Sequence, residues 1–118
     1  MPTLTSAHDL ITAVPFLIGF HPTNSIVLIS VKDDAIGLAM RIDAPQVLQS
    51  DAIDLLAHHL LREEADAALL VAYMPDERED GDSLLISLGA GLLRNGISIQ
   101  ESIVVRHGRY PRRPWLRI

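Results

Sequence analysis

Two short, uninterrupted apolar runs constrain most tightly what this chain can fold into. Residues 26–29 and 67–72 are continuously apolar, with no alternation of apolar and polar side chains. Such a run is typical of a strand buried on both faces, and it is far shorter than the ~20 residues of a membrane-spanning helix. We therefore expect a central sheet with helices packed on it.

The segments between the apolar runs carry helical signals. Residues 50–64 predict a helix with an apolar stripe at helical spacing, formed by Ile53, Leu56, Ala57, Leu60 and Leu61. Residues 83–95 predict a second long helix, ended by Gly96 in a left-handed conformation. A short helix that starts at Ser6 is expected to end near Val14, because Pro15 disfavours helical geometry in the residue before it.

Four strands are expected, at residues 25–32, 36–43, 67–73 and 97–106. The turn at residues 33–35 is too short for anything but an antiparallel hairpin, whereas connections through helices imply right-handed parallel crossovers. The predicted fold is α/β, with a mixed, mainly parallel sheet in which a hairpin precedes a β-α-β-α-β run. We expect one domain over residues 1–109 and a basic tail at residues 110–118.

The sequence shows no catalytic, cofactor or metal-binding motif. The absence of cysteine excludes disulfides, thiolate ligands and cysteine nucleophiles. Gly89 and Gly91 begin like a dinucleotide fingerprint, but Arg94 replaces the third glycine, so we expect close helix–sheet packing instead. His58 and His59 are adjacent, diverge by about 100° on a helix and cannot chelate as an i, i+4 pair can. No cofactor and no metal are expected.

Charge and chain ends bear on partners and compartment. The formal net charge is −5, and an acidic body disfavours nucleic-acid binding. The arginine-rich tail also carries Tyr110 and Trp115, so it either binds nucleic acid or an acidic partner, or packs against the acidic body of its own or a neighbouring subunit. Without a signal peptide or membrane segment, the chain is expected to be cytoplasmic. An exposed edge strand predicts a homo-oligomer.

The N-terminal part carries the most distinctive sequence. It reads LTSAHDL at residues 4–10 and AVPFLIGFHPTNS at residues 13–25. This resembles the opening of the actinobacterial family catalogued as domain of unknown function 4192, in which an RVD-like segment and an apolar strand ending in tyrosine follow. Here these are residues 41–43 and the strand that ends at Tyr73. The resemblance covers roughly residues 4–109 and implies the N-terminal part of a typically longer protein; it implies a fold but no chemistry.

Polar residues are expected to gather at one edge of the sheet. If the turn pairs residue 32 with residue 36, Ser25 faces Asp43 and Val27 faces Arg41, so Ser25, Arg41 and Asp43 share one face. Tyr73 emerges at the same edge, where open α/β sheets place ligands. The candidate ligand-binding residues are His21, Asn24, Ser25, Arg41, Asp43, Tyr73 and Asp76. The structural alternative is that Ser25 bonds its loop and Arg41 pairs with Asp43.

These observations favour a non-catalytic binding or assembly domain that recognises a small polar ligand or a protein partner. One alternative is an enzyme that uses His21 and Asp43 for acid/base chemistry. Another is a non-functional fragment of a longer protein.

Overall fold

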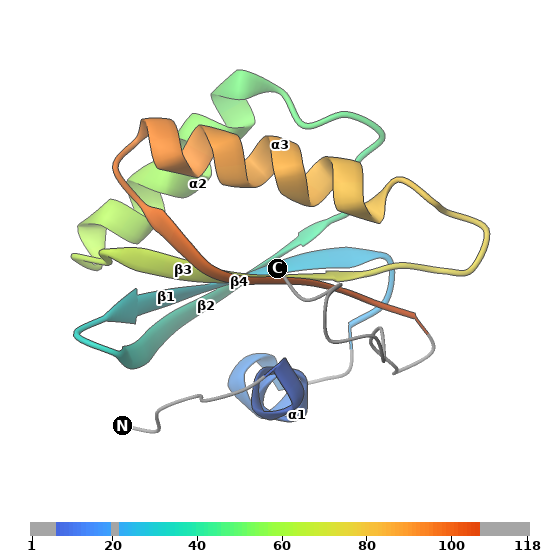
Figure 1. Cartoon of the computed structure of the whole chain (residues 1–118), viewed down its shortest axis with the longest axis horizontal. Coiled ribbons are helices and arrows are strands. Elements are labelled where there is room, and N and C mark those ends of the chain that lie inside the picture. Colours follow the sequence, from blue (N-terminus) through green and yellow to red (C-terminus); the bar gives the residue numbers. More distant parts are fainter. Residues whose placement is uncertain (1–6, 20–21, 107–118) are drawn as a thin grey trace.

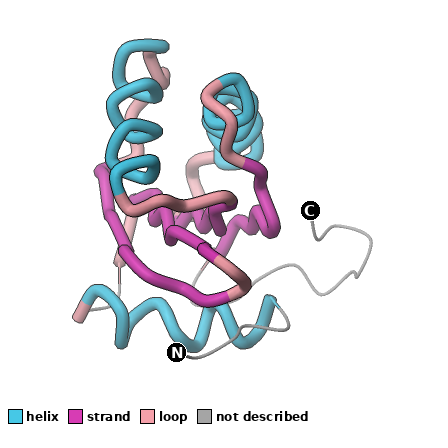
Figure 2. Tube along the Cα trace, turned by 90° about the vertical axis from the view of Figure 1, so that its left-hand side faces the viewer, coloured by secondary structure: helices cyan, strands magenta, loops and turns pink. Residues whose placement is uncertain are grey.

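The computed structural model describes residues 7–19 and 22–106, which form three layers. The described strands are β1 (Ser25–Lys32), β2 (Ala35–Asp43), β3 (Ala67–Tyr73) and β4 (Ser98–Val105). The described helices are α1 (Ala7–Ile18), α2 (Ser50–Arg62) and α3 (Gly81–Arg94). Helices α2 and α3 cover one face of the sheet, and α1 lies against the other (Figures 1 and 2).

The strand order is β2-β1-β3-β4, which confirms an α/β fold with a mixed sheet. The expectation of a mainly parallel sheet was wrong: of the described strand pairs, only β3 and β4 are parallel, because β1 lies between β2 and β3 and is antiparallel to both. The burial of the strands explains this order. Every residue of strand β1 except the last is buried. Strand β2, in contrast, is exposed or half-buried at most positions and lies at an edge. Strands β2 and β3 still run in the same direction.

The hairpin reaches the expected pairing by a different route. Asp33 and Asp34 have φ angles of 52° and 64° and form a two-residue turn, so Lys32 pairs with Ala35 and not with residue 36. The register then shifts between Ile29 and residue 31. That bulge restores the predicted pairs at the far end, where residue 25 faces residue 43 and residue 27 faces residue 41.

The side chain of Ser30 holds this bulge. The backbone N–H of Leu38 donates a hydrogen bond of 2.7 Å to Ser30 Oγ, inside an otherwise apolar part of β1. A Cβ atom at Gly37 would lie 3.0 Å from the same oxygen. The close approach of Ser30 therefore explains why glycine occupies residue 37.

Helix α1 contradicts the expectation that it ends near Val14. It continues through Pro15 to Ile18, and the N–H of Gly19 closes its last turn with a 2.8 Å bond to the carbonyl of Pro15. Gly19, at φ +86°, then ends the helix. Val14 is fully buried, and Leu17 packs with it against the sheet. This tertiary packing outweighs the local preference of proline.

Helices α2 and α3 make the larger apolar layer. The predicted stripe of α2 is buried at Ile53, Leu56, Ala57 and Leu60, but Leu61 is 44% exposed and does not belong to it. The close packing expected at the two glycines of α3 occurs at Gly91, where a Cβ atom would lie 2.3 Å from Ile53 Cγ2. The tight contact is thus between two helices, and not between helix and sheet.

Candidate functional site

Three of the candidate residues form one row across the ends of the strands, which is the candidate edge of the sheet. Ser25 pairs with Asp43 on one side and with Tyr73 on the other. Directly paired residues share a face, and Tyr73 belongs to the apolar cluster that contains Val14 of α1. The row therefore lies on the α1 side of the sheet. His21 lies outside the described residues.

Ser25 and Asn24 hold the loop that enters β1. Ser25 is buried, and its Oγ donates a 2.6 Å bond to the carbonyl of Thr23. Asn24 has a left-handed φ of 46°, its carbonyl accepts a 3.0 Å bond from the N–H of Ala44, and its Oδ1 accepts one of 3.1 Å from Arg78. Both polar side chains thus have internal partners, which fits the structural alternative for Ser25.

Arg41 and Asp43 form an ion pair on the edge strand β2. Arg41 Nη2 lies 2.7 Å from Asp43 Oδ1, and the Asp43 side chain is 87% exposed. An exposed pair of this kind contributes about 0.2–1 kcal/mol. Asp76, the remaining candidate, is exposed in the loop between β3 and α3.

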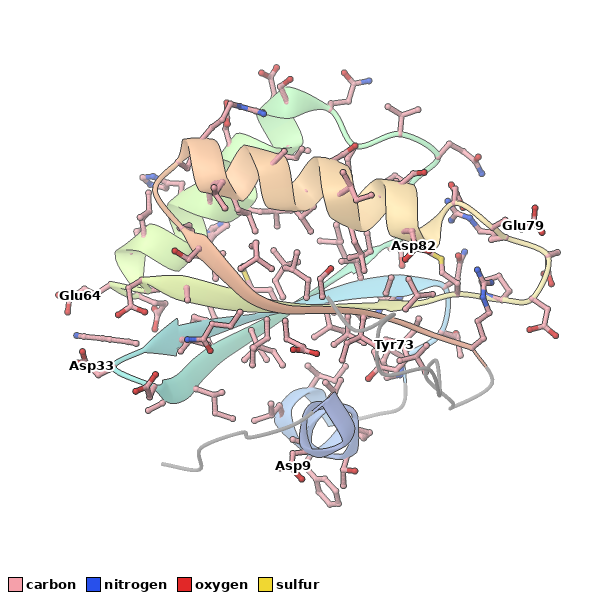
Figure 3. All side chains as sticks on the ribbon, viewed as in Figure 1. Asp9, Asp33, Glu64, Tyr73, Glu79 and Asp82 are labelled. Atoms are coloured by element: carbon pink, nitrogen blue, oxygen red, sulfur yellow. The ribbon has the colours of Figure 1, made fainter. Side chains whose placement is uncertain are left out.

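Tyr73 is the candidate whose polar group has no internal explanation. The residue is 9% exposed, and among the described residues its buried hydroxyl has no hydrogen-bond partner. Burial raises the pKa of Tyr73 to about 12. Figure 3 shows Tyr73 on the α1 side of the sheet, apart from Glu79 and Asp82. An unsatisfied buried hydroxyl costs about 1–3 kcal/mol, so this group is expected to meet a water or a ligand.

The raised pKa of Tyr73 predicts an alkaline loss of stability. The folded protein favours the neutral phenol, so this contribution is complete below the ordinary tyrosine pKa of about 10 and is lost as pH rises toward 12. Ultraviolet absorbance of the phenolate will measure it, because Tyr73 and Tyr110 are the two tyrosines of the chain and Tyr73→Phe leaves only the latter. Ionisation of Tyr73 near pH 10 in the folded protein would contradict its burial.

Arg78 was not among the residues predicted from the sequence, yet it is the most heavily bonded of the described side chains at this edge. Its guanidinium donates to Asp80 through Nε (3.0 Å) and Nη2 (2.7 Å), and to the carbonyls of Ala44 (3.0 Å) and Pro45 (2.8 Å). The bond to Asn24 brings the total to five, one for each N–H of an arginine. The hydrogen bonds from Arg78 to Asp80 lower the pKa of the Asp80 carboxyl. A single arginine within an acidic run was the available signal.

A second arginine fastens the same loop from β4. Arg106 Nη1 donates to the carbonyl of Pro75 at 3.0 Å and also to the carbonyl of Arg78. The acidic side chains of segment 74–81 are mostly exposed, but its backbone is held at several points.

Metal sites and membrane-spanning helices are two further features considered for the described residues. Within them, no group of three or more histidine, aspartate or glutamate side chains is placed to hold a metal ion. None of the described helices has the length and apolar character needed to cross a membrane.

Exposed apolar side chains occur on all three described helices. Phe16 of α1 is 85% exposed, Leu55 of α2 59%, and Ile86 and Leu93 of α3 69% and 61%. Among the described strands, β2 and β4 lie at the edges of the sheet. Oligomer formation through such surfaces stays a prediction.

A protein-family model matches most of the chain. The model of a family described as "Domain of unknown function (DUF4192)" matches residues 8–115. None of the curated proteins matches the chain. The matched span runs from α1 past the end of β4 and includes every element that forms the candidate edge.

Proposed function

The chain belongs to the family described as Domain of unknown function (DUF4192), and from that premise we propose that it is a non-catalytic binding domain for a small polar ligand. The observation that carries the proposal is the buried Tyr73 hydroxyl, which has no partner among the described residues. The ligand would lie on the α1 side of the sheet edge and accept a hydrogen bond from this hydroxyl. In native proteins, buried polar groups generally have a partner.

The surroundings of Tyr73 indicate the chemistry of the ligand. The protonated hydroxyl can donate one hydrogen bond, and the ligand would offer it an acceptor such as a carbonyl or ether oxygen. Val14, Val27 and Val105 belong to the same buried cluster, so the surroundings of Tyr73 are otherwise apolar. A small polar ligand that offers an acceptor to the hydroxyl and has an apolar part would match these surroundings.

The other candidate residues support the site and do not bind the ligand themselves in this proposal. Asn24 and Ser25 fix the entry to β1, and Arg41 holds Asp43 at the exposed edge. Acid/base catalysis needs a group held within hydrogen-bond reach of its substrate. The carboxylate of Asp43 is bonded to Arg41 and 87% exposed, which favours binding over the acid/base alternative with His21.

A thermal-shift screen tests this function. The wild-type protein, Tyr73→Phe and the control Asp43→Asn are melted with a panel of small ketones, amides, esters and sugars. We expect at least one compound to stabilise the wild type and the control. Tyr73→Phe should be as stable as the wild type without ligand, or up to about 1 kcal/mol more stable, because the unpartnered hydroxyl is gone.

The same variant should bind the stabilising compound about tenfold more weakly, which corresponds to one lost hydrogen bond. An undiminished shift in Tyr73→Phe would contradict the role of the hydroxyl. If no compound of the panel stabilised the wild type, the proposed class of ligand would be wrong.

A further inference from the structure

We propose that residues 74–80, between β3 and α3, form a strap that closes one edge of the sheet, with Arg78 as its latch. Releasing the latch would open the strap as a unit while the sheet stays folded. This inference rests on the contacts of Arg78 and Arg106 and holds whether or not Tyr73 binds a ligand.

The reach of Arg78 is the first support. From the loop after β3, its side chain crosses the start of β1, where it bonds Asn24, and reaches the end of β2, where it bonds the carbonyls of Ala44 and Pro45. Its remaining bonds go to Asp80, at the start of α3. One planar group thus connects three segments that are far apart in the sequence.

Arg106 supplies the second fastening, from the end of β4. Its Nη1 donates to the carbonyls of Pro75 and Arg78, so it holds the strap through the backbone. The two arginines together link the ends of all four described strands at this edge. The right-hand side of Figure 3 shows the strap near its labelled residue Glu79, extending beyond the sheet.

Beyond Met74, which belongs to the main core cluster, few of the strap's side chains are buried. Asp76, Glu77 and Glu79 are exposed, so they bury little apolar surface, and their like charges repel one another at this spacing. The ends are anchored separately: the N–H of Met74 bonds the carbonyl of Val105 at 2.9 Å, and that of Leu84 bonds the carbonyl of Asp80 at 3.0 Å. Between these anchors, the guanidinium groups of Arg78 and Arg106 supply bonds that join the strap to the ends of the neighbouring strands.

Such a segment meets the physical description of a local opening unit. Residues 75–80 are all exposed or half-buried, whereas the neighbouring strands β1 and β3 are almost completely buried. Opening would free the loops at Asn24 and at Ala44 together, because the same side chain bonds both.

Hydrogen exchange of the full chain tests the latch. We compare the wild type with Arg78→Met, Arg78→Lys and a control, Arg62→Met, in which an exposed arginine of α2 is replaced. In Arg78→Met, the amides of residues 76–80 and of Ala44 should exchange at least about tenfold faster, while those of β1 and β3 keep their protection. Arg78→Lys should behave similarly, because an ammonium has three donors and no planar fork. The control should match the wild type.

Two results would contradict the proposal that Arg78 is the latch of the strap. One is equal acceleration in the strap and in β1 and β3, or failure of Arg78→Met to fold, since either would make Arg78 part of the global core. The other is unchanged exchange in the strap. Asp80→Asn provides a milder variant that leaves the carbonyl bonds of Arg78 in place, and it should accelerate the strap less than Arg78→Met.

Discussion

Replacement of Gly91 by alanine will destabilise the protein, whereas the same replacement at Gly89, two residues earlier in α3, will not. A Cβ atom at Gly91 would lie 2.3 Å from Ile53 Cγ2, inside the contact between α3 and α2. A Cβ atom at Gly89 would lie 3.5 Å from Ile99 Cγ1, which is an ordinary contact distance. The two glycines thus form a matched pair in one helix.

The two replacements are expected to change the free energy of unfolding in opposite directions. Alanine is favoured over glycine in a helix interior by about 0.8–1 kcal/mol, so Gly89→Ala should raise the free energy of unfolding by up to that amount. At Gly91 the overpacking cost exceeds this gain, and we expect a net loss of about 1–3 kcal/mol in urea unfolding. Equal effects at the two positions would mean that α2 and α3 are not in close contact there.

A double-mutant cycle identifies the partner. Ile53→Ala removes the methyl group that the new Cβ would meet, at the cost of a cavity. If the clash is the cause, Gly91→Ala together with Ile53→Ala should be less destabilising than the sum of the single changes by about 0.5–3 kcal/mol. Strict additivity would point to a different cause.

The two glycines also show how far the sequence predicts packing. Helical periodicity placed Gly89 and Gly91 in a core helix and indicated close packing there. Which of them makes the contact depends on how α2 crosses α3, and periodicity within one helix carries no information about that crossing. The same limit applies to the sheet: apolar runs identified its strands, but not the insertion of β1 between β2 and β3.

The candidate edge was predictable only where backbone pairing decides the outcome. The pairing of Ser25 with Asp43 was predicted because hairpin register follows from the turn, although the assumed turn was one residue too long and the bulge at Ser30 compensated. Tyr73 emerges at the same edge as expected. Arg78 could not be placed, because its role depends on a long side chain that reaches loops 34 and 54 residues away in the sequence. The binding roles of all these residues stay predictions.

At Pro15, the local rule that proline ends a helix gave a wrong prediction. Pro15 has no N–H to donate, and its ring clashes with the carbonyl four residues earlier, yet α1 continues to Ile18. Val14 is fully buried beside it and Leu17 packs against the same cluster, so the helix is held by the sheet on this side. The helix therefore bears a local cost that its packing offsets.

Pro15→Ala should consequently stabilise the protein. Proline is about 3 kcal/mol less favourable than alanine in a helix interior, and part of that gain will be lost because alanine leaves the unfolded chain more freedom. We expect urea unfolding to show an increase of about 1–3 kcal/mol. Thr12→Ala, at an exposed position of the same helix, is the control and should change stability by about 0.5 kcal/mol. A loss of stability in Pro15→Ala would instead show that the proline ring, or the bend it imposes, is what seats Val14 and Leu17 on the sheet.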